Sequence, residues 1–192
     1  MVGEPLPVRA PAVSKQLLLI NFLAFQVGWF ACVMGAANGM PSLGPIVVLG
    51  VIALHLSFAI ESKPEIRLMI CAALIGVVYD SLLVYAGLVS YSNGTLIAGT
   101  APYWIVTLWV LFATTLNVSL RWLRGNMLLA GVLGAIAGPL SYLAGSKLGA
   151  VEFAQPAYAV VALAAGWAMF MPMLIQLADR FDGFQLPARQ PA

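Results

Sequence analysis

Apolar and polar positions follow one another along this chain in long blocks. Six long apolar stretches are separated by short polar connections, and they cover Leu17–Ala37, Leu43–Ile60, Leu68–Val89, Tyr103–Leu120, Met127–Ser146 and Ala157–Leu177. A helix needs about twenty apolar residues to cross the ~30 Å hydrocarbon core of a bilayer, and in lipid its backbone groups must be hydrogen-bonded internally. The pattern therefore predicts an all-α fold, a polytopic bundle of six transmembrane helices.

Basic residues mark the two sides of this bundle unequally. If the six stretches alternate in direction, Lys147 lies on one side of the membrane and all other basic residues lie on the opposite side, namely Arg9, Lys15, Lys63, Arg67, Arg121, Arg124, Arg180 and Arg189. Cytoplasmic connections carry an excess of Lys and Arg, so both termini are expected in the cytoplasm. The composition agrees with a membrane protein, because only 8% of the residues are charged, against about 25% in soluble domains.

The chain divides into one membrane domain and two tails. We expect residues 1–14 to form a mobile cytoplasmic tail, residues 15–180 a single six-helix domain, and residues 181–192 a second cytoplasmic tail. No connection is long enough to hold a catalytic domain, so any chemistry must lie among the helices. The basic residues are too sparse and too close to helix ends to predict nucleic-acid binding.

Asp80 is the polar residue that is hardest to explain as a membrane-facing side chain. It follows Arg67 by thirteen residues, about 20 Å along a helix axis, and so lies close to the middle of the bilayer. An aspartate at that depth costs about 2.5–3.5 kcal/mol on insertion scales. Two interpretations stay open: a group that binds a ligand or a proton, or a carboxyl fixed in a hydrogen bond between helices.

Four further polar residues are candidates for the same site. His55 is the only histidine of the chain, and it suits proton transfer or hydrogen bonding to Asp80 or to a ligand headgroup, although a packing role is equally open. Thr114 and Asn117 lie on one face of the fourth predicted helix, and Asn21 lies at a similar depth on the first. We hypothesise that Asn21, His55, Asp80 and Asn117 converge in the cytoplasmic half of the bundle.

The first predicted helix carries two different faces. Gln26 points away from Asn21, toward the same side as Trp29, and both are candidate ligand contacts. A stripe of small residues at four-residue spacing consists of Ala24, Gly28, Cys32 and Ala36. Such stripes allow close approach of helices in lipid, either within one chain or against another membrane protein. We therefore keep this stripe as a candidate docking face for a partner.

Motifs of known enzyme chemistry do not occur in this sequence. It contains no nucleophile elbow, phosphate-binding loop, paired carboxylates or metal-ligand cluster. Neither a metal nor another cofactor is predicted, and catalysis stays open but disfavoured, since Asp80 and His55 alone are a narrow basis for an enzyme.

Several segments resemble an uncharacterised bacterial inner-membrane family, a domain of unknown function. The resemblance rests on four segments: Asn21 with Phe25-Gln26-x-Gly28-Trp29-Phe30, Asp80-Ser81, Thr114-Thr115-Leu116-Asn117-x-Ser119-Leu120-x-Trp122, and Gly138-Pro139-Leu140-x-Tyr142. It implies a multi-pass protein of the bacterial cytoplasmic membrane and implies no activity. In its architecture alone, the chain is also similar to the substrate-binding subunits of energy-coupling-factor vitamin transporters.

Three functions are compatible with the sequence. The first is binding or transport of a small apolar or amphipathic molecule by a protein embedded in the lipid bilayer, with a pocket around Asp80. The second is an accessory role or an enzymatic step in membrane-lipid metabolism, and the third is a structural role in membrane assembly. A cavity favours the first, contact between Asp80 and His55 favours the second, and a filled bundle favours the third.

Overall fold

The structure, a computed structural model, describes residues 14–185 and is mostly helical in them, as predicted. Its elements are α1 (Lys15–Ala37), α2 (Leu43–Phe58), α3 (Ser62–Tyr85), β1 (Val89–Tyr91), α4 (Tyr103–Leu116), the 3₁₀-helix η1 (Arg121–Leu123), α5 (Met127–Lys147), β2 (Val151–Phe153) and α6 (Pro156–Arg180). The two short strands were not predicted. They pair antiparallel, with Ser90 opposite Glu152, and join two connections at one end of the bundle. Of the expected tails, residues 1–13 and 186–192 lie outside the described part.

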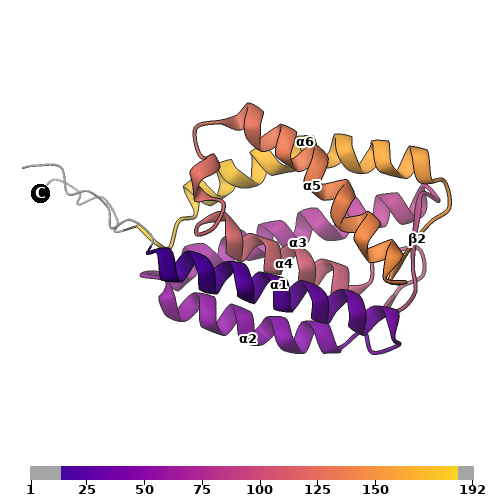
Figure 1. Cartoon of the computed structure of the whole chain (residues 1–192), viewed down its shortest axis with the longest axis horizontal. Helices are drawn as coiled ribbons and strands as arrows, with labels where there is room; N and C mark the ends of the chain where they lie inside the picture. Colours follow the sequence, from indigo (N-terminus) through magenta and orange to yellow (C-terminus); the bar gives the residue numbers. More distant parts are fainter. Residues whose placement is uncertain (1–13, 186–192) are drawn as a thin grey trace, which may run out of the picture.

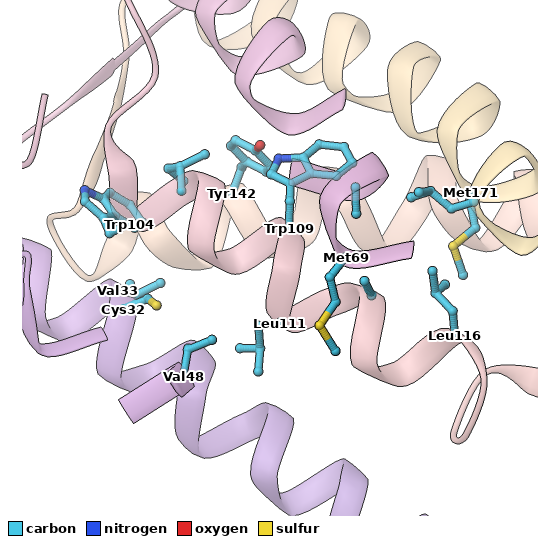
Figure 2. Close-up of a cluster of buried hydrophobic side chains, with 14 of the residues drawn as sticks. Cys32, Val33, Val48, Met69, Trp104, Trp109, Leu111, Leu116, Tyr142 and Met171 are labelled. Atoms are coloured by element: carbon cyan, nitrogen blue, oxygen red, sulfur yellow. The ribbon is translucent and has the colours of Figure 1, made fainter. Parts of the chain in front are cut away.

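The helices pack as three pairs (Figure 1). The pair α1–α2 lies at one side, α5–α6 at the other, and α3–α4 between them. Helix α4 is the centre of the bundle, since it contacts α1, α2, α3 and α6. Its buried side chains include Trp104, Trp109 and Leu111, which Figure 2 shows within the core.

Local sequence explains where several helices begin and end. The Ser14 side chain accepts a hydrogen bond from the amide of Leu17 at the start of α1, and Asn126 does the same for α5. These caps satisfy amides that have no partner within the helix. Pro156 occupies the first turn of α6, where its missing N–H has no consequence. The predicted end at residue 120 was four residues too far, because the chain leaves α4 at Asn117.

Within residues 14–185, four helices are long and apolar enough to cross a membrane: α1, α3, α5 and α6. Helices α2 and α4 have 16 and 14 residues and rise about 24 and 21 Å, less than the ~30 Å of a hydrocarbon core. The outer face of α3 is apolar at four-residue spacing, with Ile70, Leu74, Val78 and Leu82 between 54% and 60% exposed. Such a face suits contact with lipid, so the chain has the helices of a membrane protein, while the count of six spans stays a prediction.

The small-residue stripe of α1 lies largely inside this chain. Cys32 and Ala36 are fully buried, and a side chain at Gly28 would meet Leu111 of α4 and Val48 of α2. The stripe therefore brings α1 close to its own neighbours. On α5, Gly138 plays the same part, because a Cβ there would overlap the indole of Trp167 on α6.

Candidate ligand-binding site

A cleft with a volume of about 630 Å³ runs between α1 and α5 over α4. Its lining is mainly aromatic and aliphatic, and it comprises Phe22, Phe25, Gln26, Trp29, Phe30, Val33, Trp104, Ile105, Leu108, Trp109, Phe112, Thr115, Ser119, Leu120, Leu123, Leu133, Gly134, Ala137, Gly138, Leu140, Ser141, Tyr142, Gly145, Val151, Trp167 and Met171. Ligand pockets in proteins typically measure about 300–1,000 Å³ and are mostly apolar. The cleft has the size and lining of such a pocket.

Aromatic side chains form the floor of the cleft, and a hydrogen bond from one of them links its two walls. Trp109 of α4 stacks on Trp167 of α6 with ring centroids 4.8 Å apart and an angle of 11° between the ring planes. Phe112 meets Trp167 edge to face, with centroids 5.3 Å apart. The Nε1 group of Trp29 on α1 donates to Ser141 Oγ on α5 at 3.0 Å, and thereby joins the two walls.

Asp80 lies behind this floor and is fully buried. Its Oδ1 accepts hydrogen bonds from the hydroxyls of Tyr91, at 2.6 Å, and Tyr142, at 2.5 Å, while Oδ2 accepts from Trp109 Nε1 at 2.7 Å. Tyr91 belongs to β1, outside the helices. Its burial, together with the nearby Asp80 carboxyl, raises the pKa of Tyr91 well above its ordinary value. The hydroxyl therefore stays protonated and can donate.

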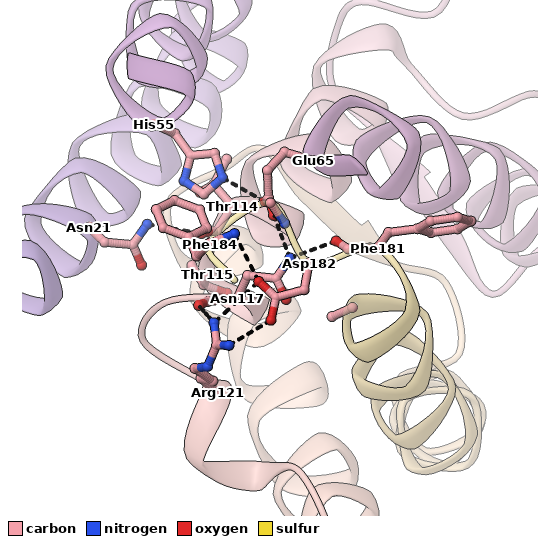
Figure 3. A network of polar contacts seen from close by, with 12 residues as sticks. Asn21, His55, Glu65, Thr114, Thr115, Asn117, Arg121, Phe181, Asp182 and Phe184 are labelled. Carbon is pink, nitrogen blue, oxygen red and sulfur yellow. Dashed lines mark hydrogen bonds and ion pairs between the residues drawn. The ribbon is translucent and has the colours of Figure 1, made fainter. Parts of the chain in front are cut away.

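A second polar cluster lies at the opposite end of the bundle (Figure 3). Its centre is Glu65 in the first turn of α3, which is fully buried. Glu65 Oε2 lies 2.8 Å from His55 Nε2, and Oε1 accepts from Asn117 Nδ2 at 2.6 Å and from the Gly183 amide at 2.7 Å. The ring of Phe184 packs against His55 with centroids 5.1 Å apart. The cluster thus joins α2, α3, α4 and the segment that follows α6.

Arginines from the connection between α4 and α5 extend this cluster. Arg121 Nη2 lies 2.6 Å from Asp182 Oδ2, and Arg124 Nη1 lies 2.7 Å from the same oxygen. Arg124 also donates to Asn117 Oδ1 at 2.5 Å. These basic residues, which the sequence marked only as indicators of membrane orientation, fix the end of α6 to the connection after α4.

Asn21 forms a separate link between α1 and α4. Its Nδ2 donates to the backbone carbonyl of Thr114 at 3.0 Å, and its Oδ1 accepts from Ser119 Oγ at 2.6 Å. The Thr114 hydroxyl donates to the carbonyl of Leu111 in its own helix. Asn21 and Thr114 are both buried and therefore tie α1 to the central helix.

The structure divides the predicted site residues among three places. Gln26 and Trp29 line the cleft, and Asp80 lies behind the cleft floor. Asn21, His55, Thr114 and Asn117 lie near one another at the other end of the bundle, since Asn21 and His55 line one small pocket and Asn117 meets His55 through Glu65 (Figure 3). The hypothesis that Asn21, His55, Asp80 and Asn117 all converge is therefore wrong for Asp80 alone. Asp80 lies fifteen residues beyond Glu65 on α3, about 22 Å along the axis, and it bonds to other partners than His55.

Glu65 is the main polar residue that sequence reasoning did not select. It lies in the first turn of α3 and is fully buried. The available indication was its position ten residues after His55, across a short connection between two neighbouring helices.

No curated protein and no solved structure matches this chain. A family model described as "Protein of unknown function (DUF2878)" matches residues 18–173, from the first turn of α1 to the interior of α6. The match includes every helix and most of the lining of the cleft, so the chain belongs to the DUF2878 family.

Proposed function

We propose that this protein binds a small apolar or amphipathic molecule in the cleft between α1 and α5, as a binding or transport component of the bacterial cytoplasmic membrane. The observation that carries this proposal is the cleft of about 630 Å³ with its aromatic lining. A bundle that served only as a scaffold would be expected to fill that space, because protein interiors are close-packed.

The shape of the cleft favours an elongated ligand that arrives from the lipid. Lining residues on α1 extend from Phe22 to Val33, about 17 Å along the axis. At the rim, Phe30 is 46% exposed and Leu140 is 58% exposed. Apolar side chains that are exposed at this position suit contact with acyl chains, so the ligand reaches the cleft sideways from the bilayer.

The proposed membrane topology has six spans and cytoplasmic termini. Helices α2 and α4 are short, but α4 lies in the centre of the bundle, where its ends are covered by protein and need not reach the headgroups. The basic residues near the starts of α1 and α3 support the cytoplasmic placement of that end.

A role in lipid metabolism or membrane assembly has less support. Asp80 and His55 bind different partners, so they do not offer a shared acid–base site. The small-residue stripe of α1 is packed against α2 and α4, which leaves it little free surface for a partner.

Filling the cleft tests the proposal. Ala137→Phe places a ring among the lining residues, whereas the neighbouring Ile136→Phe places it on the exposed face of α5 outside the lining. We expect the wild type and Ile136→Phe to retain a small lipophilic molecule after gentle detergent extraction, measured by mass spectrometry. Ala137→Phe should retain about tenfold less of this molecule, equivalent to ~1.4 kcal/mol of binding free energy. Equal retention by both variants, or none by the wild type, would contradict the proposal.

A further inference from the structure

Most hydrogen-bonding groups in the lining already have partners inside the protein. Among the indoles, Trp29 donates to Ser141 Oγ, Trp104 to a backbone carbonyl and Trp109 to Asp80. The fourth indole, Trp167, has no hydrogen-bond partner in the described part of the chain, but its Nε1 atom is closed off from solvent and from any occupant. Trp104 and Trp109 are buried, whereas the half-buried indoles of Trp29 and Trp167 offer the ligand apolar surface.

Three of the four hydroxyl groups of the lining are occupied in the same way. Ser119 Oγ donates to Asn21 Oδ1, Thr115 Oγ1 to the carbonyl of Phe112, and Tyr142 to Asp80. A buried polar group with a partner gains little from a second one. These hydroxyls are therefore poor candidates for ligand recognition.

Two groups of the lining are exceptions among residues 14–185: the hydroxyl hydrogen of Ser141, whose oxygen accepts from Trp29, and the carboxamide of Gln26. The carboxamide is the larger group, and it makes no hydrogen bond with any of these residues. A carboxamide provides two N–H donors and a carbonyl acceptor, and leaving them unpaired in an apolar site is costly. Gln26 follows Lys15 by eleven residues, about 16 Å along α1, so its amide lies near the middle of that helix.

The charge of the lining restricts the ligand further. None of the lining residues is Asp, Glu, Lys, Arg or His. Asp80, the nearest buried carboxyl described above, lies behind Trp109 and Tyr142 and is occupied by their hydrogen bonds. An anionic or cationic headgroup in this cleft would lose its water without gaining a counter-charge, which is strongly unfavourable.

We infer that the ligand is an uncharged lipophile with a carbonyl or hydroxyl group within its length, and that Gln26 hydrogen-bonds to this group deep in the bilayer. This inference rests on the proposed function, since it specifies the occupant of the same cleft. A charged phospholipid headgroup does not fit it, whereas a neutral lipid such as a long-chain ketone or alcohol does.

Quenching of tryptophan fluorescence by brominated probes tests the inference. Four of the five tryptophans line the cleft, and Trp122, the fifth, is 61% exposed outside it. In a Trp122→Phe background, quenching therefore reports on the cleft. The probes are four compounds of equal chain length with a terminal bromine: a ketone, an alcohol, an alkane and a carboxylate, titrated into protein in nanodiscs.

We expect the ketone and the alcohol to bind about five- to tenfold more tightly than the alkane, the gain of one hydrogen bond in an apolar site. Gln26→Leu removes this preference and leaves the affinity for the alkane unchanged. Gln155→Leu is the matched control, since Gln155 is exposed at the start of α6 outside the lining, and it keeps the preference.

The results separate this inference from the proposed function. Saturable quenching of equal affinity by all three neutral probes, or tightest binding of the carboxylate, overturns the inference and leaves the cleft as a binding site. A preference that survives in Gln26→Leu also overturns it. Absence of saturable quenching by every probe overturns the proposed function as well.

Discussion

At the residue scale, Asp80 connects three separate parts of the chain. Its carboxylate accepts donors from β1, α4 and α5 at distances between 2.5 and 2.7 Å. Both oxygens of this group are already bonded within the protein, so the contacts favour the interpretation of Asp80 as a residue that holds helices together. Its effect on the cleft is indirect, through the position of Trp109 and Tyr142.

Asp80→Asn tests that role. The substitution turns one acceptor oxygen into an NH₂ group, so the donors of Tyr91, Tyr142 and Trp109 compete for a single carbonyl oxygen and at least one of the three hydrogen bonds is lost. We expect the free energy of unfolding to fall by about 2–4 kcal/mol, measured by denaturation in detergent. Tyr158→Phe, at a 70% exposed tyrosine, is the control and should change nothing. Unchanged stability in Asp80→Asn would show that the three bonds contribute little.

The sequence predicted that Asp80 lies inside the bundle, because its distance in residues from Arg67 gives its depth along the helix. It could not predict the partners, since residue count does not determine which neighbouring helix faces a given side chain. Gln26 and Trp29 were correctly separated from Asn21 by their angle around α1. Glu65 was missed because a carboxylate beside Lys63 and Arg67 is usually solvated.

At the element scale, the short segment after α6 is part of the bundle. Phe181 accepts from Asn117 through its carbonyl, Asp182 binds Arg121 and Arg124, and Gly183 bonds to Glu61 and Glu65 through its backbone. The expected tail from residue 181 therefore begins with an ordered attachment. No pattern in the sequence indicates this attachment, because the contacts come from elements more than fifty residues away.

Gly183→Ala should release this segment. A Cβ at Gly183 would overlap the carbonyl of Glu61 and lie 2.7 Å from Glu65 Cγ. We expect a protease that cuts after Phe to cleave at Phe181 or Phe184 about tenfold faster, because local opening becomes easier by ~1.4 kcal/mol.

The control for this experiment is Gly50→Ala. Gly50 lies in α2 with no atom near the position of an added Cβ, so its cleavage rate should match the wild type. If Gly183→Ala is cleaved no faster than Gly50→Ala, the segment is not held by the contacts around Glu65.

At the scale of the whole molecule, the apolar pattern predicted the helices but not how many of them cross the bilayer. Two of them are shorter than a hydrocarbon core. The short strands were beyond prediction, since three-residue strands carry too little periodicity. The cleft was equally unpredictable, because a cavity depends on how α1 and α5 diverge over α4 rather than on the residues of any one helix.

Cysteine labelling in intact cells tests the six-span topology. In a background with Cys32→Ala and Cys71→Ser, which removes both native thiols, Glu152→Cys should react with a membrane-impermeant maleimide added outside. Lys63→Cys should react only after lysis. If α2 did not cross the membrane, the connection containing Lys63 would lie outside, and labelling of Lys63→Cys in intact cells would disprove six spans.

Trp109 makes two contacts at once, a ring stack and a hydrogen bond, and these limit which side chains relatives can carry at this position of the cleft. One face of its indole is stacked on Trp167 and forms the cleft floor, while its N–H is committed to Asp80. Replacing Trp109 by another aromatic residue would preserve the floor of the cleft. It would also leave Oδ2 of Asp80 without its hydrogen-bond donor. Substitutions that reshape the cleft are therefore easier to accommodate in its walls, on α1 and α5, where side chains can vary without disturbing the hydrogen bonds of Asp80.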